Sequence, residues 1–226
     1  MKKFVLDLGG SIVAPEKFQP GFLQKLCRVL NKHVQNGCQF FIVIGGGAIC
    51  REYNQRALSV RSDIQREELD WLGIQATRLN ATFLRTALGD IACQNIFLSP
   101  NELPETDKKI IIGGGWKPGN STDYVATVLA KNQQVDSMVV LTNVSHVYDK
   151  DPNKFPEAKK FEKMNWQELK AIIGNEWLPG AKLPLDPLAC ALAEEIGLKV
   201  VVIHGRDLDN FERFLRGEDF IGTTIS

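Results

Sequence analysis

The sequence predicts an α/β fold built on a parallel sheet, and two observations lead to this. Short, almost continuously apolar runs that are rich in β-branched residues alternate with longer segments of helical periodicity. Strands that helices cover on both faces have this composition, and strand–helix alternation favours parallel strands joined by right-handed crossovers. Because no linker or internal repeat interrupts the alternation, we expect a single domain over residues 1–226.

The expected strands and helices follow one another along the whole chain. The five apolar runs that we expect to be strands lie at 4–8, 39–44, 109–112, 137–142 and 198–204. The segments with helical spacing lie at roughly 20–35, 47–59, 63–88, 122–132, 165–173, 187–196 and 208–216. The stretch 143–164 is richer in Asp, Asn, Lys and Pro, and we expect it to be irregular.

Capping residues mark the ends of the last two expected helices. Asp186 stands before a proline, a good N-cap followed by a good first helical residue, and Gly197 closes the same helix. Asp207 and Gly217 flank the final helix in a similar way. These residues therefore predict the bounds of both helices.

Composition excludes several classes of protein. The chain has 27 basic and 27 acidic residues and no net charge, whereas a nucleic-acid-binding protein normally gathers a basic excess on one face. The five cysteines show no C-x-x-C spacing, so a reducing compartment is expected rather than a disulfide framework or a zinc site. No apolar run approaches the roughly 18 residues that cross a bilayer, and no secretory signal is visible. We therefore expect a cytoplasmic protein without membrane or nucleic-acid partners.

Glycine clusters at the ends of three strands carry the chemical signal. They are Gly9 and Gly10 followed by Ser11, then 45–47, and then 113–115. Ligands of open α/β sheets bind beyond the carboxyl ends of the strands, where glycine lets backbone N–H groups approach phosphate oxygens. Neither the Walker pattern nor the dinucleotide pattern is present. The sequence thus predicts a phosphate-rich ligand in an unusual cradle.

These clusters, together with the segments 69–81, 113–123, 142–152 and 185–197, resemble the amino acid kinase superfamily and, within it, the archaeal-type uridylate kinases. The resemblance implies a three-layer αβα sandwich with a mostly parallel sheet of about eight strands. It implies an N-terminal acceptor lobe at about 1–130 and a C-terminal ATP lobe at about 131–226. The implied reaction is phosphoryl transfer from MgATP to UMP, in a homo-oligomer that is a hexamer built from dimers.

The resemblance also implies which residues bind ATP. They are Gly10, Ser11, Gly47, Arg51, Thr142, Asn143, Tyr148 and Asp151. The Arg51 guanidinium would bind phosphate, and Asp186 would organise the catalytic cations, so these two are the expected catalytic residues. Mg²⁺ would enter with ATP, without a direct protein ligand. The structural alternatives are a solvated helix charge for Arg51, a helix cap for Asp186 and a loop turn for Asp151.

A second set of residues is implied for the acceptor. It consists of Gly46, Asp70, Trp116, Lys117, Pro118, Gly119, Asn120, Ser121 and Thr122. Asp70 would accept hydrogen bonds from the ribose, and the hydroxyls of Ser121 and Thr122 would donate to the acceptor phosphate. The structural alternatives are a surface acid for Asp70 and plain helix capping for the two hydroxyls.

The sequence departs from the family pattern near the phosphates. Most of the superfamily has Lys where this chain has Asp7, and Ala48 also replaces a frequent Lys. Candidate replacements for the lost positive charge are Lys117, Lys150 and Lys182. Two further departures are Trp116, in the loop 116–122 that would bind the acceptor phosphate (the acceptor loop), and His146, in the segment 142–151 that would bind the nucleoside (the nucleoside segment). Both bear on the identity of the acceptor.

Three functions therefore remain open at this stage. The first is a UMP kinase. The second is a kinase of the same fold that acts on another small acceptor, such as an isoprenoid phosphate, a carbamate or an amino acid. The third is a non-catalytic ATP-binding protein that resembles the molybdenum storage proteins.

Overall fold

The computed structural model describes residues 1–152, 154–174 and 185–226 and confirms the predicted α/β class. The described strands are β1 Lys2–Leu8, β2 Cys38–Ile44, β3 Ile110–Gly113, β4 Ser137–Thr142, β5 Val147–Tyr148, β6 Lys160–Phe161, β7 Lys163–Met164, β8 Lys199–His204 and β9 Thr223–Ile225. The described helices are α1 Gly10–Val13, α2 Pro20–Gln35, α3 Gly47–Val60, α4 Arg66–Leu88, α5 Thr122–Gln133, α6 Trp166–Ile173, α7 Pro187–Glu195 and α8 Leu208–Arg216, with a short 3₁₀ turn at Gly89–Ile91. All five expected strands and all seven expected helices are present.

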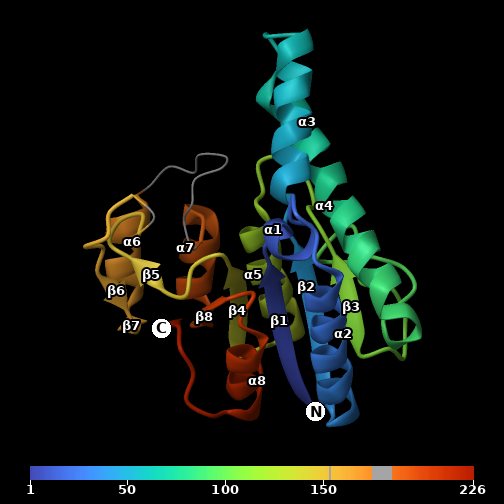
Figure 1. Cartoon of the computed structure of the whole chain (residues 1–226), viewed down its shortest axis with the longest axis vertical. Helices are drawn as coiled ribbons and strands as arrows, with labels where there is room; N and C mark the ends of the chain where they lie inside the picture. The colour runs from blue at the N-terminus through green and yellow to red at the C-terminus, as the bar shows by residue number, and fades with distance from the viewer. Residues whose placement is uncertain (153, 175–184) are drawn as a thin grey trace.

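A seven-stranded sheet runs through the middle of the molecule in the order β3-β2-β1-β4-β8-β9-β7 (Figure 1). The first five of these strands are parallel, and β9 pairs antiparallel with β8. The described residues thus place seven strands in the main sheet and not eight, because β5 and β6 form a separate pair. The sheet is continuous across the boundary between the two lobes expected from the sequence.

Helices cover both faces of the sheet and give the predicted three layers. Along β1, Phe4, Leu6 and Leu8 belong to a core shared with α2 and α8, whereas Val5 belongs to a core shared with α5 and α7. Because side chains alternate along a strand, Asp7 faces the same layer as Val5. Strand periodicity therefore directs this carboxylate toward α5 and α7.

The predicted helix caps are confirmed. The Asp186 carboxylate accepts from the backbone N–H groups of Leu188 and Ala189 at the start of α7, and Asp207 caps α8 through the N–H of Asn210. Gly217 ends α8 in the left-handed conformation, with φ of 76°. Helix capping therefore fixes the position of Asp186, a candidate site residue, and this capping role was predicted from the sequence.

Helix α3 and the first half of α4 form a hairpin that projects beyond the end of the sheet (Figure 1). No residue of α3 is buried in the chain. Among the described residues, no helix has both the length and the apolar composition that crossing a lipid bilayer requires.

Candidate active site

The tips of β1 and β2 meet through bare backbone. Gly45 N–H donates to the carbonyl of Leu8 over 3.0 Å. A Cβ on Gly10 would lie 2.3 Å from the carbonyl oxygen of Gly45 and 2.4 Å from the backbone nitrogen of Gly47. Gly47 has φ of +63°, a conformation that side chains other than glycine rarely adopt. The first two glycine clusters therefore meet at adjacent strand tips, and the phosphate ligand expected there stays a prediction.

The third glycine cluster has a different explanation. A Cβ on Gly113 would lie 2.4 Å from the ring of Phe97, and one on Gly114 would lie 2.5 Å from Oγ1 of Thr77. The N–H of Gly115 donates to the same Thr77 hydroxyl over 2.7 Å. Close packing of this segment against Phe97 and α4 accounts for these glycines, and approach to a ligand is not needed to explain them.

Asn80 is a buried positioning residue that the sequence analysis missed. It lies on α4, and its Nδ2 donates to the carbonyl oxygens of Gly45 over 2.9 Å and of Gly46 over 3.1 Å. The signal available in the sequence was an amide on the buried face of a long helix, but its target lies 35 residues away along the chain. Asn80 fixes the backbone of the second glycine cluster.

Helix α4 also holds the predicted acceptor loop. The Asp70 carboxylate accepts from the N–H of Gly119 over 2.8 Å, and the Arg78 guanidinium donates to the carbonyl of Trp116 over 3.3 Å. Within the loop, the Lys117 ammonium lies 4.2 Å from the centre of the Trp116 ring. Asp70 and the acceptor loop are thus brought together, as the sequence predicted.

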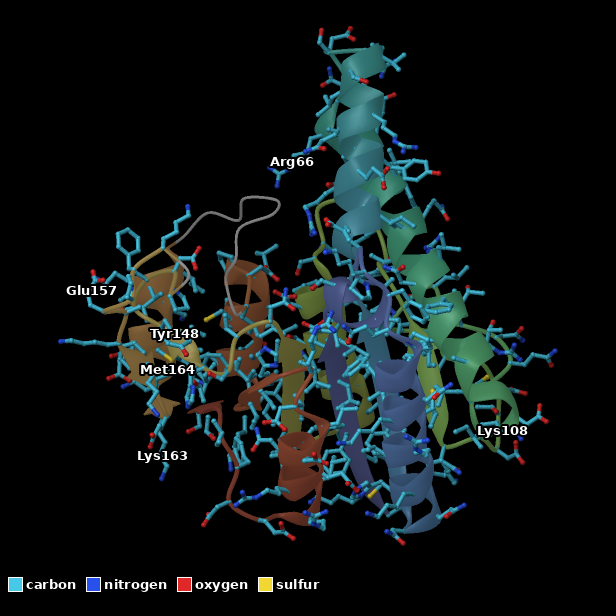
Figure 2. All side chains as sticks on the ribbon, in the orientation of Figure 1. Arg66, Lys108, Tyr148, Glu157, Lys163 and Met164 are labelled. Carbon is cyan, nitrogen blue, oxygen red and sulfur yellow. The ribbon has the colours of Figure 1, made fainter. Side chains whose placement is uncertain are left out.

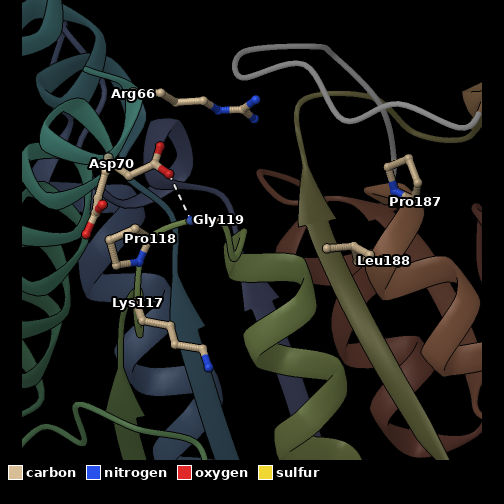
Figure 3. A pocket seen from close by; sticks show the side chains of 8 residues that line it. Arg66, Asp70, Lys117, Pro118, Gly119, Pro187 and Leu188 are labelled. Atoms are coloured by element: carbon tan, nitrogen blue, oxygen red, sulfur yellow. Dashed lines mark hydrogen bonds between the residues drawn. The ribbon is translucent and has the colours of Figure 1, made fainter. Parts of the chain in front are cut away.

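An open cavity of about 760 Å³ lies beside this loop (Figure 3). Its lining comes from α4, the acceptor loop and the start of α7, namely Arg66, Glu67, Asp70, Lys117, Pro118, Gly119, Pro187 and Leu188. The Arg66 side chain extends from α4 toward the α7 side of this space (Figures 2 and 3). Two cationic and two acidic side chains therefore line a space large enough for a small polar molecule.

Three carboxylates from different elements lie close to one another at the start of α7. Asp7 comes from β1, Asp123 from the first turn of α5, and Asp186 from the cap of α7. The backbone N–H of Asp186 donates to Asp123 over 3.0 Å, and the Ser121 hydroxyl donates to the Asp186 carboxylate. Ser121 at the same time caps α5 by accepting from the N–H of Tyr124. The capping role considered for Ser121 is therefore formed, and its single hydroxyl proton is donated to Asp186, so donation to an acceptor phosphate stays a prediction.

Burial and crowding alter the acidity of this group. Burial, followed by the nearby charge of Asp123, raises the pKa of Asp7 well above its usual value. Burial and then the charge of Asp186 raise the pKa of Asp123 to about 6. Asp123 was not among the residues expected from the sequence to bind a ligand, although an acid in the first turn after a glycine-rich loop was a visible signal. Asp7 was noted only as a departure from the family pattern.

Polar contacts also join the residues predicted for ATP. Asn143 Nδ2 donates to the Ser11 hydroxyl over 3.0 Å, so the ends of β1 and β4 are linked beside the first glycine cluster. The Thr142 carbonyl accepts from the N–H of Gly205 over 2.7 Å. Arg51 is exposed one turn into α3. Ser11, Thr142 and Asn143 thus lie together at the strand tips, next to Gly10 and Gly47.

The nucleoside segment predicted from the sequence contains a chain of polar side chains. The Tyr148 hydroxyl lies 3.2 Å from the Ser145 hydroxyl, which lies 2.9 Å from Nδ1 of His146. His146 is buried, and burial lowers its pKa. The carbonyl of Asp151 accepts from two backbone N–H groups, so the turn expected there as an alternative is formed.

The lysines considered as replacement cations have other partners or lie elsewhere. Lys150 pairs with Glu157 over 2.8 Å and lies 5.3 Å from the ring centre of Phe155. Lys117 lies over Trp116 at the acceptor cavity. Lys182 lies outside the described residues.

A parallel sheet with bare glycine backbone at adjacent strand tips is typical of α/β proteins that bind ligands beyond the carboxyl ends of their strands. The chain belongs to the amino acid kinase family, whose sequence profile matches residues 2–204. The uridylate kinase of Methanospirillum hungatei is 38% identical, with the alignment covering 100% of this chain and 95% of that protein. The uridylate kinase of Pyrococcus abyssi is also 38% identical over 99% of both chains. The crystal structure of uridylate kinase from Archaeoglobus fulgidus superimposes with a TM-score of 0.85 at 31% identity and covers 100% of both chains.

Proposed function

We propose that the protein is a kinase that transfers the γ-phosphoryl group of ATP to UMP and so forms ADP and UDP. The observation that carries the proposal is the bare backbone contact between the β1 and β2 tips, which would let phosphate oxygens approach main-chain N–H groups, together with a separate polar cavity on the acceptor loop. The similarity to uridylate kinases favours UMP as the acceptor over other small molecules. It also favours a kinase over a storage protein.

Transfer in this site would be direct, without a covalent intermediate. Phosphoryl transfer of this kind depends on positioning and on stabilisation of charge in the transition state. Glycine backbone at 10 and 47, with Ser11 and Asn143, would hold the ATP phosphates, and Tyr148 would lie beside the adenine. The proposed ATP side thus occupies the tips of β1, β2 and β4.

On the acceptor side, Asp70 and the loop 116–122 would hold UMP. The contact from Gly119 uses one oxygen of the Asp70 carboxylate, and a carboxylate has further acceptor sites for the ribose hydroxyls. Asp186, the N-cap of α7, would organise the catalytic cations. Its second carboxylate oxygen accepts a hydrogen bond from the Ser121 hydroxyl. A single carboxylate thus connects the acceptor loop with α7.

The divalent ion belongs to the substrate in this proposal. Within the described residues, no group of three or more His, Cys, Asp or Glu side chains is arranged to hold a metal ion. Mg²⁺ would enter with ATP on the phosphate oxygens, and when bound it neutralises phosphate charge.

A coupled ADP-release assay with MgATP and a panel of nucleoside monophosphates tests the proposal. We expect turnover with UMP and much less with AMP, GMP or CMP. Turnover with a non-nucleotide acceptor alone would replace UMP by that acceptor. Tight ATP binding without any turnover would instead support the storage function.

We also propose a cytoplasmic homo-oligomer, with a hexamer built from dimers as the specific form. Large apolar side chains are exposed on α3 and α4, among them Tyr53, Leu58, Val60, Leu79 and Phe83. Contiguous exposed apolar groups favour association. The cysteines are all free, which fits a reducing compartment. Light scattering after size-exclusion chromatography measures the mass, and a monomer would contradict the oligomer.

A further inference from the structure

The arginine that follows β8 lies beside the first glycine cluster. Gly205 N–H donates to the carbonyl of Thr142 over 2.7 Å, and a Cβ on Gly205 would lie 3.0 Å from Cγ1 of Ile12 in α1. The tip of β8 therefore packs directly on α1. The next residue, Arg206, donates its backbone N–H to Nδ1 of His204 over 3.3 Å. The position of the Arg206 backbone is thus set by the sheet and not by a free loop.

The side chain of Arg206 reaches back across α1 to Ser11. Its Nη2 lies 3.4 Å from the Ser11 carbonyl oxygen, and its guanidinium carbon lies 5.7 Å from the ring centre of Phe22. Ser11 is also the residue whose hydroxyl receives Asn143. Arg206 is exposed to solvent. A planar guanidinium with several donors, of which one contacts Ser11, can present its other N–H groups to an anion at the same place.

We propose that Arg206 binds the phosphates of the nucleotide donor at the tips of β1 and β4. This inference rests on the proposed function, because it assumes that ATP lies beside Ser11 and Asn143. Arg206 would supply the positive charge that the family pattern places at the position of Asp7, but from the end of β8. Lys150 and Lys117 have the separate contacts described above, on Glu157 and Trp116.

The state of Asp7 is compatible with polyphosphate nearby. An ionised carboxylate at this position would repel the donor phosphates. Burial among other acids raises its pKa, which favours the neutral form. Arg206 contacts Ser11 and Phe22 of α2, whereas Asp7 faces the layer of α5 and α7. The two groups therefore do not neutralise each other, and the charge of Arg206 stays available to a ligand.

Equilibrium binding of ATP and of AMP to the purified full chain, without acceptor, tests this inference. A charge-assisted hydrogen bond to phosphate corresponds to about ten-fold or more in affinity. We expect Arg206→Ala to weaken ATP binding by about that factor and AMP binding by less than about two-fold, because AMP lacks the outer phosphates. Arg206→Lys should fall between wild type and Arg206→Ala for ATP. Arg213→Ala, an exposed arginine on α8, is the matched control and should bind both nucleotides as wild type does.

Each alternative outcome has a distinct meaning. If wild type binds ATP and phosphorylates UMP while Arg206→Ala binds ATP normally, this inference alone is wrong. Equal weakening of ATP and AMP would also overturn it, because that pattern indicates a packing role on α1 and Phe22. If wild type does not bind ATP at all, the proposed function fails and this inference fails with it.

Discussion

At the scale of single residues, the buried acids are the least expected feature of the site. Asp7, Asp123 and Asp186 come from three elements, and burial followed by neighbouring charge raises the pKa of Asp7 and of Asp123. A carboxyl group with a raised pKa lowers the free energy of unfolding in the pH range where it would be ionised in the unfolded chain but is still protonated in the folded protein. Natural proteins retain costs of this kind mainly at functional sites.

The pH dependence of stability tests this reading of the acids. A carboxyl group whose pKa is raised by folding stabilises the folded state fully at pH values below its pKa in the unfolded chain, near 4. This stabilisation is lost as the pH rises through the pKa in the folded protein, which is about 6 for Asp123. Asp7→Asn removes one acid while keeping a hydrogen-bonding side chain. We expect it to exceed wild type in free energy of unfolding by about 1–3 kcal/mol at pH 8 and by little at pH 4. Urea unfolding across this range measures the difference.

The exposed Asp90 supplies the control for this experiment. Asp90→Asn should track wild type at every pH, because a solvated carboxylate has little to gain from neutralisation. A stability difference for Asp7→Asn that does not grow between pH 4 and pH 8 would show that Asp7 is not held in its protonated form.

Asn80 illustrates a second residue-level effect. Its amide satisfies the Gly45 carbonyl at the tip of β2. Asn80→Ala leaves that acceptor without its partner, so we expect the free energy of unfolding to fall by roughly 1–3 kcal/mol and the KM for ATP to rise. Thr82→Ala removes only an exposed hydroxyl contact on the same helix and should change stability by less than about 0.5 kcal/mol. Equal effects of the two variants would remove the positioning role of Asn80.

At the scale of elements, local sequence determined what could be predicted. Long strands and helices were found because apolar periodicity and caps such as Asp186 are written within each segment. The elements missed, β5, β6, β7, β9 and α1, have only two to four residues each, too few to show a period. Asp70 and the acceptor loop were named because each belongs to a short segment that resembles the family, whereas their mutual contact across 49 residues is visible only in the structure. Asn80, Asp123 and Arg206 were missed because their partners lie on other elements.

The cap of α7 yields an element-scale prediction. In Asp186→Asn one amide oxygen can still accept from Leu188 and Ala189, and the amide nitrogen can donate to the Ser121 hydroxyl. We expect thermal stability close to that of wild type, since Asn caps helices as well as Asp does. Turnover with UMP should fall about a hundred-fold or more, if the carboxylate charge organises the catalytic cations.

Helix α8 provides a matched cap for comparison. Asp207→Asn changes the same kind of N-cap at a position where the cap serves only its own helix through Asn210. Stability should change to a similar small extent, and turnover should stay the same. If Asp186→Asn keeps full turnover, Asp186 is a structural cap and nothing more.

At the scale of the whole molecule, the parallel order of β3, β2, β1, β4 and β8 aligns all their carboxyl ends along one edge. The proposed donor residues lie over β1 and β4, and the acceptor cavity lies beside the loop that follows β3. Parallel topology therefore explains how segments from the start, middle and end of the chain reach one site. Two ligands bound along this edge would lie side by side, with their phosphates meeting near the β1 and β2 tips.

A bisubstrate ligand tests this arrangement. Adenosine and uridine joined by a chain of phosphates should bind more tightly than ATP or UMP alone, because linkage makes the second contact intramolecular. At a fixed concentration it should also raise the thermal midpoint more than either nucleotide does, since stabilisation follows RT ln(1 + [L]/Kd). A ligand with two adenosines and the same phosphate chain is the control, and it should gain less because the acceptor cavity would receive the wrong base. If the mixed ligand binds no better than ATP, the donor and acceptor sites do not meet at the glycine tips, and direct transfer between them is excluded.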